Sequence, residues 1–249
     1  MNKLTLMIVV AFSFLQANSQ EGKISIGLQF RPLIPVETFD GPPLFYSNES
    51  LETTVTNKFG GSFGMLIRRD FTEKWSLEFG INQTRRNYAL SMRDNSGDAV
   101  LIPHNTSVGI ISYEIPVQGL YYVKLSPDFF MNVMTGISFN GFPTDIAKYE
   151  EGYRFNGRYG NKYSISLLAN VGFEYRTKEY GKFYLGASLH RPIKPIYLAT
   201  TEIEKNGDQL VSGDGITGNF LSLDIRYFFK ATDVSEKKKE PEKDRIIGD

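Results

Sequence analysis

The stretch from Tyr163 to Arg176, YSISLLANVGFEYR, decides how the rest of the sequence is interpreted. Alternate residues, beginning with Tyr163 and ending with Tyr175, are apolar. The residues between them include Ser164, Glu174 and Arg176, and most of them are polar. Because successive side chains of a β-strand point to opposite faces, this pattern predicts a strand with one apolar and one polar face. Such a strand, with one face toward lipid and the other toward water, is typical of a transmembrane β-barrel.

The same alternation recurs along the chain and predicts eight strands. They cover residues 22–31, 58–69, 75–88, 107–125, 129–140, 163–176, 182–191 and 218–229. Short connections at 70–74, 126–128 and 177–181 alternate with long ones at 32–57, 89–106, 141–162 and 192–217. Outer-membrane barrels have short periplasmic turns and long extracellular loops. We therefore predict an all-β fold, an eight-stranded antiparallel transmembrane up-and-down β-barrel. A β-sandwich is the less favoured alternative, because it need not alternate short with long connections.

Aromatic residues give a second indication of a membrane barrel, because barrels in lipid carry aromatic girdles at both interfaces. In the phase of the predicted strands, one outward-facing group lies near the periplasmic end and the other near the extracellular end. The first group is Trp75, Phe129, Phe183, Tyr227 and Phe229, and the second is Phe30, Phe59, Tyr113, Phe139 and Tyr163.

The two ends of the chain are predicted to lie outside the barrel, which gives three segments: 1–19, 20–230 and 231–249. In the first, Lys3 precedes an apolar run from Leu4 to Leu15, and small residues follow before Gln20. This order predicts a cleaved secretory signal peptide, since the run is shorter than the roughly 20 residues of a spanning helix. The last segment is highly charged, which predicts a disordered periplasmic tail.

Composition excludes several classes of function. The 249 residues include no cysteine, so a disulfide or a thiolate metal site is excluded. Basic and acidic residues balance at 28 each, which gives no electrostatic reason to expect nucleic-acid binding. His104 and His190 are the only histidines. No Gly-x-Ser-x-Gly elbow is predicted, since Gly60 to Gly64 match that spacing only inside the predicted strand 58–69, and the sequence has no His-Glu-x-x-His motif. We therefore expect no catalytic site, no cofactor and no metal.

The inward face of the predicted barrel carries charges of both signs. An eight-stranded barrel is only just wide enough for its own side chains, and an unpaired buried charge is costly. We therefore expect these charges to pair and to fill the lumen, although a narrow channel for ions or small solutes remains the alternative. The predicted polar network of the lumen is Arg68, Glu78, Arg86, Glu114, Glu174, Arg176, Asp224 and Arg226; Arg31, Lys58 and Lys124 are predicted to face inward as well.

One predicted hairpin carries a motif. The stretch Ser112 to Val117, SYEIPV, is followed by Tyr121-Tyr122-Val123 and, after a short turn, by Met131 to Gly136. This hairpin resembles that of the PorT-like outer-membrane β-barrel family, in which a Tyr-x-Glu-Ile-Pro strand leads into an aromatic strand end and a tight turn. The resemblance implies an outer-membrane barrel, and some members are similar to accessory factors of protein secretion. The tail after the last strand departs from the pattern.

Within this motif, Pro116 is unusual, because proline removes a hydrogen-bond donor from a closed sheet. It predicts a β-bulge that would aim Glu114, two residues earlier, at an interior arginine. A proline that is simply tolerated remains the alternative.

We therefore expect a monomeric, non-enzymatic outer-membrane barrel that serves as a structural or interaction protein of the envelope. Its expected partners are outer-membrane lipid and lipopolysaccharide, and a periplasmic or surface protein partner remains open. The loop from Pro32 to Asn57 contains an apolar group, Phe39 and residues 42–46, which makes it the best candidate contact surface. A lid folded over the barrel mouth is the alternative role for this loop.

Overall fold

The computed structural model describes residues 23–35, 44–48, 51–94, 106–150, 153–205 and 208–230. The predicted signal peptide, the charged tail, His104 and half of the apolar group of the first loop, namely Phe39, Pro42 and Pro43, lie outside these ranges. No helix in the described part of the chain is long and apolar enough to cross a membrane.

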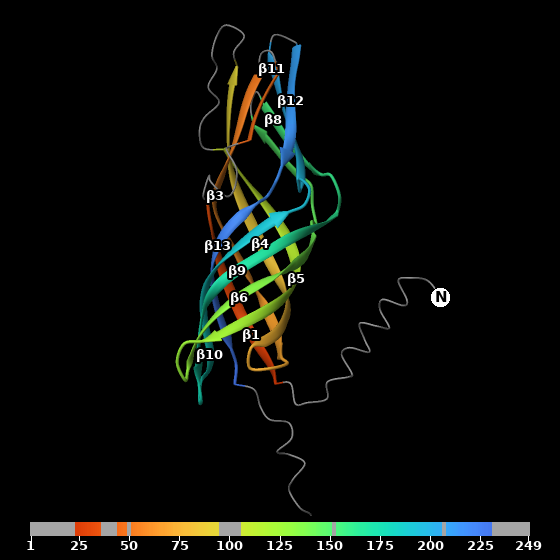
Figure 1. The fold of residues 1–249 in the computed structure, drawn as a ribbon. Helices are drawn as coiled ribbons and strands as arrows, with labels where there is room; N and C mark the ends of the chain where they lie inside the picture. The colour runs from red at the N-terminus through yellow and green to blue at the C-terminus, as the bar shows by residue number, and fades with distance from the viewer. Residues whose placement is uncertain are drawn as a thin grey trace, which may run out of the picture.

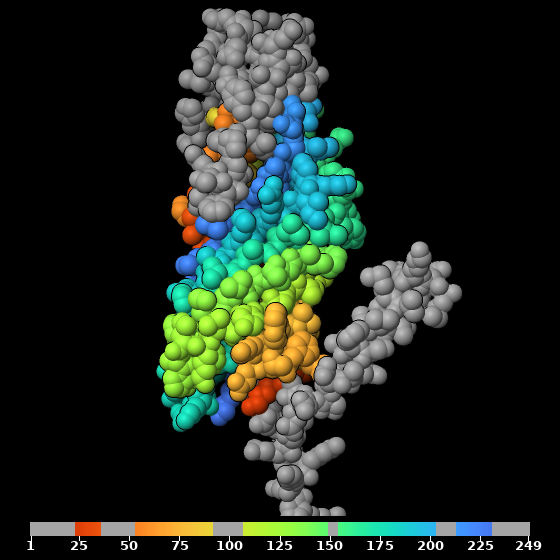
Figure 2. Space-filling view, in the orientation of Figure 1, coloured from red at the N-terminus to blue at the C-terminus, as the bar shows by residue number. Residues whose placement is uncertain are grey.

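Eight strands form a closed antiparallel barrel, which is elongated along its axis (Figures 1 and 2). They are β1 (Ile24–Ile34), β3 (Leu51–Asp70), β4 (Trp75–Asp94), β5 (Thr106–Lys124), β6 (Phe129–Gly141), β9 (Tyr163–Thr177), β10 (Gly181–Pro192) and β13 (Phe220–Phe228). The sheet runs β1-β13-β10-β9-β6-β5-β4-β3, and β1 closes the ring by pairing with β3 as well. The predicted fold class is confirmed.

Three short turns lie at one end of the barrel, together with Lys23 and Lys230, the first and last described residues. In the β3–β4 turn, the backbone N–H groups of Phe71 and Thr72 donate to the carbonyl of Trp75 at 3.0 and 3.2 Å. The β9–β10 turn ends at Gly181, whose φ of +97° suits glycine, and a Cβ there would lie 2.2 Å from the carbonyl oxygen of Phe228. The predicted positions of the short turns are confirmed.

The outward side chains of the eight strands form an apolar belt. On β6 the belt runs from Phe129 to Phe139 and on β9 from Tyr163 to Tyr175, close to the roughly 9–11 residues with which a tilted strand crosses a membrane. On β4 it ends at Ile81, because the next outward residue is Gln83. Nine of the ten predicted girdle residues are exposed on this surface, from Phe129 at 38% to Tyr163 at 73%, and Tyr227 packs between Phe183 and Phe229.

Beyond the belt, much of the predicted long loops is strand. β3 and β4 have 20 residues each, well beyond the predicted 58–69 and 75–88. β2 (Leu44–Asn48) pairs with β3, while β7 (Ile146–Glu150), β8 (Tyr153–Tyr159), β11 (Tyr197–Lys205) and β12 (Asp208–Ile216) form a separate four-stranded sheet. The prediction that residues 141–162 and 192–217 are loops is therefore wrong for most of their length. We call this part of the molecule, with the outer ends of β3, β4 and β5, the outer extension (Figure 1).

The outer extension has its own hydrophobic core. β12 contacts β2 and β3, and β7 contacts β5, so the extended strands and the four-stranded sheet surround it. The inward positions that carry charge within the barrel carry apolar residues here, which is why these segments fold instead of staying solvated. The core consists of Val55, Tyr88, Leu90, Val108, Ile110, Phe142, Phe155, Ile196, Tyr197, Ala199 and Ile216, each at most 6% exposed.

A β-bulge in β3 corrects the predicted orientation of Lys58. Lys58 is paired with Asn87 and Gly61 with Arg85, so two residues of β3 lie opposite Arg86 alone. Such an insertion reverses the phase of the strand beyond it. Lys58 is consequently exposed and does not face the lumen, contrary to the prediction.

At Pro116 the predicted bulge is absent. The β4–β5 register is the same on both sides, with Phe79 opposite Val117 and Asn82 opposite Glu114, and only the pairing between them is interrupted. On its other side Pro116 stays in register opposite Ser138 of β6. The prediction of a bulge is therefore wrong: the proline leaves a local break in one ladder without shifting the strands.

Candidate functional site: the charged lumen

All eight residues of the predicted polar network point into the barrel. Seven are at most 3% exposed, and the Arg176 side chain, nearest the turns, is 25% exposed. Arg31 is also inside, at 4% exposure, whereas Lys124 is exposed at the rim. The structure divides the charges into two groups along the barrel axis.

Six of them form one continuous chain of ion pairs, which we call the lower cluster. Arg68 is central, since its Nη2 lies 2.8 Å from Glu78 Oε2 and its Nη1 contacts the carboxylate of Glu174. Arg226 joins Glu78 to Asp224 through Nη1 and Nη2, at 2.5 and 2.6 Å. Arg176 completes the chain, with Nε 2.7 Å from Glu174 Oε1. Three guanidinium groups thus balance three carboxylates.

Aromatic rings pack against each guanidinium of the lower cluster. The Arg68 guanidinium lies 3.8 Å from the centre of the Phe228 ring, and that of Arg176 lies 4.0 Å from the centre of the Phe130 ring. The Arg226 guanidinium lies 4.9 Å from the centre of the Tyr184 ring. These cation–π contacts fill the space around the ion pairs with side-chain atoms.

Asp224 is held by a polar shell as well as by Arg226. Its Oδ2 accepts hydrogen bonds from Ser188 Oγ at 2.6 Å and from Asn170 Nδ2 at 2.9 Å, and its Oδ1 accepts one from Ser222 Oγ at 2.8 Å. Both oxygens are therefore satisfied, as a buried carboxylate requires.

The upper cluster, nearer the outer extension, is built on Glu114. Its two carboxylate oxygens accept from Arg31 Nη2 and Arg86 Nη2, both at 3.0 Å. Ser62 and Ser112 accept further hydrogen bonds from these arginines, at 2.9 and 2.7 Å. Glu114 thus faces interior arginines, as proposed from its position in the motif, but two guanidinium groups share one carboxylate.

An aromatic stack borders the upper cluster. The rings of His190 and Phe220 stack with centres 4.5 Å apart, and the Arg86 guanidinium lies 4.9 Å from the centre of the Phe220 ring. His190 Nε2 is 3.8 Å from Glu114 Oε1, too far for a hydrogen bond, and neither ring nitrogen has a partner among the described residues. A cavity of about 20 Å³ beside Arg86 and Phe220 is large enough for about one water molecule.

The lumen is thus layered along its axis. The lower cluster lies near the turns, and the upper cluster follows. The core of the outer extension comes next: Arg86 of the upper cluster is paired with Ile110 of this core, and the next inward pair, Tyr88 with Val108, belongs to the core entirely. The ion pairs of this arrangement link strands across the lumen. Among the described residues, no group of three or more His, Cys, Asp or Glu side chains could hold a metal ion.

Several residues of this site were missed from the sequence. Tyr122, Tyr184, Phe220 and Phe228 have the same inward phase as the charges, and this phase was available as a signal. It was not used, because aromatic residues were sought on the outward face only. Arg31 was predicted to face inward but was not included in the network.

Comparisons with known proteins agree with this architecture. No known family profile matches the chain, and no curated protein matches it in sequence. The outer membrane protein OprG from Pseudomonas aeruginosa is similar in structure, with a TM-score of 0.50 and 14% identity, over 84% of this chain and 97% of OprG. The outer membrane protease OmpT from Escherichia coli is 11% identical over 84% of this chain and 96% of OmpT. Its TM-score of 0.34 is too low to support a common fold. The chain therefore has the fold of an eight-stranded outer-membrane β-barrel.

Proposed function

We propose that this protein is a monomeric, closed and non-enzymatic barrel of the outer membrane, which presents its outer extension at the cell surface as an interaction module. The observation that carries the proposal is the hydrophobic core of the outer extension, which is built on the same strands as the barrel. β3, β4 and β5 run without a break from the turns to this core. The barrel then acts as an anchor for a folded surface unit.

The apolar belt supports the location. Large apolar side chains such as Ile67, Leu185 and Ile225 are 37–54% exposed around the barrel, and such a surface is unfavourable in water. Polar residues replace them outward on β4 beyond Ile81, as expected where a strand leaves the bilayer. The N-terminal sequence, with the features of a signal peptide, supports export.

The layered lumen supports a closed barrel rather than the alternative, a channel or a small-solute transporter. Conduction requires a continuous water-filled path, and here two ion-pair clusters and an apolar core succeed one another along the axis. In planar bilayers the purified protein should give no steady conductance. Reproducible, ion-selective openings that disappear in Arg86→Gln or Asp224→Asn would instead establish a channel.

Topology is tested by cysteine labelling, because the natural chain contains no cysteine. Asn156→Cys in the outer extension should react with a membrane-impermeant thiol reagent on intact cells, and Asp128→Cys in the β5–β6 turn should react only after lysis. The reverse pattern would show that the orientation is inverted.

The SYEIPV hairpin supports a more specific form of the proposal, relatedness to PorT-like barrels and a role beside a protein-secretion apparatus. Its Glu114 organises the upper cluster, so the motif has a structural purpose in this chain. A photo-crosslinking amino acid at Arg158, on the outer extension, should capture a surface partner that the same probe at Lys178, in the β9–β10 turn, does not. Crosslinks to secretion components at either site would favour the specific form.

A further inference from the structure

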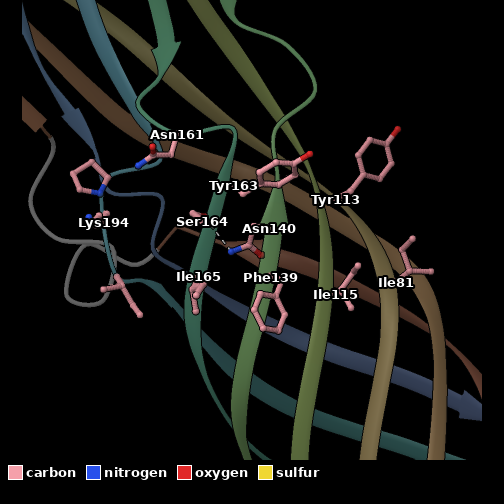
Figure 3. Close-up of a pocket in the computed structure, with 13 residues that line it drawn as sticks. Ile81, Tyr113, Ile115, Phe139, Asn140, Asn161, Tyr163, Ser164, Ile165 and Lys194 are labelled. Carbon is pink, nitrogen blue, oxygen red and sulfur yellow. Dashed lines mark hydrogen bonds between the residues drawn. The ribbon is translucent and has the colours of Figure 1, made fainter. Parts of the chain in front are cut away.

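A groove of about 660 Å³ lies on the outer surface of the barrel, where the apolar belt meets the outer extension (Figure 3). Its apolar lining comes from four neighbouring strands and includes Ile81, Ile115, Phe139 and Ile165, all on the lipid-facing side. The volume is within the range of roughly 300–1,000 Å³ that is usual for small-molecule sites. The groove therefore exceeds the ordinary roughness of a barrel wall.

One position in the outer row of side chains along the groove is a glycine. Gly141 of β6 lies between Tyr113 of β5 and Tyr163 of β9, with which it is paired on either side. A Cβ at Gly141 would meet only the ring of Tyr163, at the ordinary contact distance of 3.8 Å, so a larger side chain there would compete with that ring for space in the groove. In Figure 3 the two tyrosine rings lie above Ile115 and Phe139.

The other wall of the groove is the segment that follows β10. The N–H of Ile193 donates to the carbonyl of Ile165 at 3.0 Å, which continues the pairing beyond Pro192, and the next two residues line the groove. Asn140 and Ser164, joined by a hydrogen bond of 3.3 Å, add a polar part to the floor.

Three exposed cations lie around this end of the groove. Lys194 lines it, Lys162 is adjacent in sequence to the lining residues Asn161 and Tyr163, and Arg191 points outward on β10 opposite Leu167. All three are exposed, and none forms an ion pair with any residue that the structure describes. Because these three cations have no counterion among the described residues, this edge of the belt can attract an external anion.

We propose that this groove binds one phosphate-bearing, acylated lipid of the outer leaflet, with an acyl chain along the apolar lining and a phosphate near Lys194, Lys162 and Arg191. Apolar surface below and positive charge above are arranged in the order in which an anionic lipid presents its chain and its headgroup. The proposal rests on the proposed location in the outer membrane, and it adds to it a defined lipid site on one side of the barrel.

The test is native mass spectrometry of the purified full-length protein in detergent, with lipid A as the probe. The wild type should retain one lipid A molecule, and dephosphorylated lipid A or phosphatidylcholine should be retained much less. Lys194→Gln should weaken binding about fivefold, and the triple variant with Lys162→Gln and Arg191→Gln about a hundredfold, because each cation near a phosphate surface contributes a factor of about five. Lys178→Gln, a cation in a turn at the opposite end, should have no effect.

Steric filling separates groove binding from simple attraction to the cations. Gly141→Leu should abolish retention of lipid A, whereas Gly119→Leu should not, because Gly119 faces open space in the belt but lies outside the groove. Equal retention in the two leucine variants, or equal competition by inorganic phosphate alone, would overturn the proposal. A second copy of the chain on the groove would appear as a dimer and would overturn it too. Because the assay uses purified protein, its failure leaves the cysteine-labelling test of location unaffected.

Discussion

Lys182 of β10 and Asp70 of β3 form an ion pair across the mouth of the barrel at the end with the short turns, with Nζ 2.9 Å from Oδ2, although β1 and β13 separate their strands in the sheet. Ser76 Oγ donates a second hydrogen bond to Asp70, at 2.5 Å. The pair closes the lower end of the lumen below the lower cluster. It also ties together two strands that have no backbone contact.

The Lys182–Asp70 pair predicts a pH dependence. Burial favours the neutral form of Asp70, but the charge of Lys182 and the hydrogen bond from Ser76 outweigh it and hold the pKa of Asp70 below its usual value. A lowered pKa in the folded state contributes stability above the unfolded pKa of about 3.9, and this contribution is lost as the pH falls through the folded value. We expect Asp70→Asn to lower the free energy of unfolding by roughly 1 kcal/mol at pH 7 and by much less at pH 2. Urea unfolding in detergent measures both, and an equal loss at both pH values would contradict the role of the charge.

Substitution of Glu114 should destabilise the barrel strongly. Glu114→Leu would leave Arg31 and Arg86 buried without a counterion, at a cost of roughly 3–5 kcal/mol. The exposed Glu73→Leu, in the β3–β4 turn, is the matched control and should change the unfolding midpoint little. If the two variants unfold alike, the upper cluster is hydrated and the closed-lumen interpretation fails.

The bulge in β3 sets which residues enter the core of the outer extension. Insertion of one alanine after Gly60 should shift the strand beyond the bulge by a further residue and move Val55 from this core to the surface, because a shift of one residue reverses every side chain of the strand. We expect the outer extension to become sensitive to protease while the barrel stays protected. Gly61→Ala changes a neighbouring glycine with open space in front of it, and it should be tolerated. Protection of the extension after the insertion would show that the bulge does not set which residues enter the core.

Tyr197 links β11 of the outer extension to β8 and to the segment between β6 and β7. Its ring packs edge-on against Phe142 and Tyr159, and its hydroxyl donates to the carbonyl of Thr144 at 2.6 Å. Burial, together with the charge of Asp145, raises the pKa of Tyr197 to about 12. The neutral phenol is therefore favoured by folding, so the extension should lose stability as the pH rises above the unfolded value of about 10. Tyr197→Phe should cost roughly 1 kcal/mol at neutral pH and should reduce this loss in alkali, as followed by limited proteolysis.

The barrel could be predicted from the sequence because lipid and water impose an alternation that each strand shows by itself. The pattern from Tyr163 to Arg176 is readable without knowledge of any partner strand. The ion-pair partners of the inward charges could not be predicted in this way. Arg68 meets Glu174, 106 residues along the chain, only because the barrel closes. Phase alone places a charge inside, and only the register selects its counterion.

The remaining errors have physical causes of the same kind. Lys58 was misplaced because a bulge is a property of two paired strands and leaves no mark in one of them. The strands of the outer extension were missed because β7 and β8 are short and become stable only against the common core around Phe155 and Tyr197. Pro116 was expected to force a bulge, but a break in one ladder satisfies the same constraint.

The uninterrupted length of β3 has a mechanical consequence. The strand is paired with β4 from Leu51 to Asp70, and its inner half is paired with β1 from Gly60 to Arg69. A load applied to the outer extension along the barrel axis therefore acts parallel to these ladders, so that many hydrogen bonds resist sliding together instead of opening one after another. A unit attached in this way can transmit tension to the barrel without unfolding first.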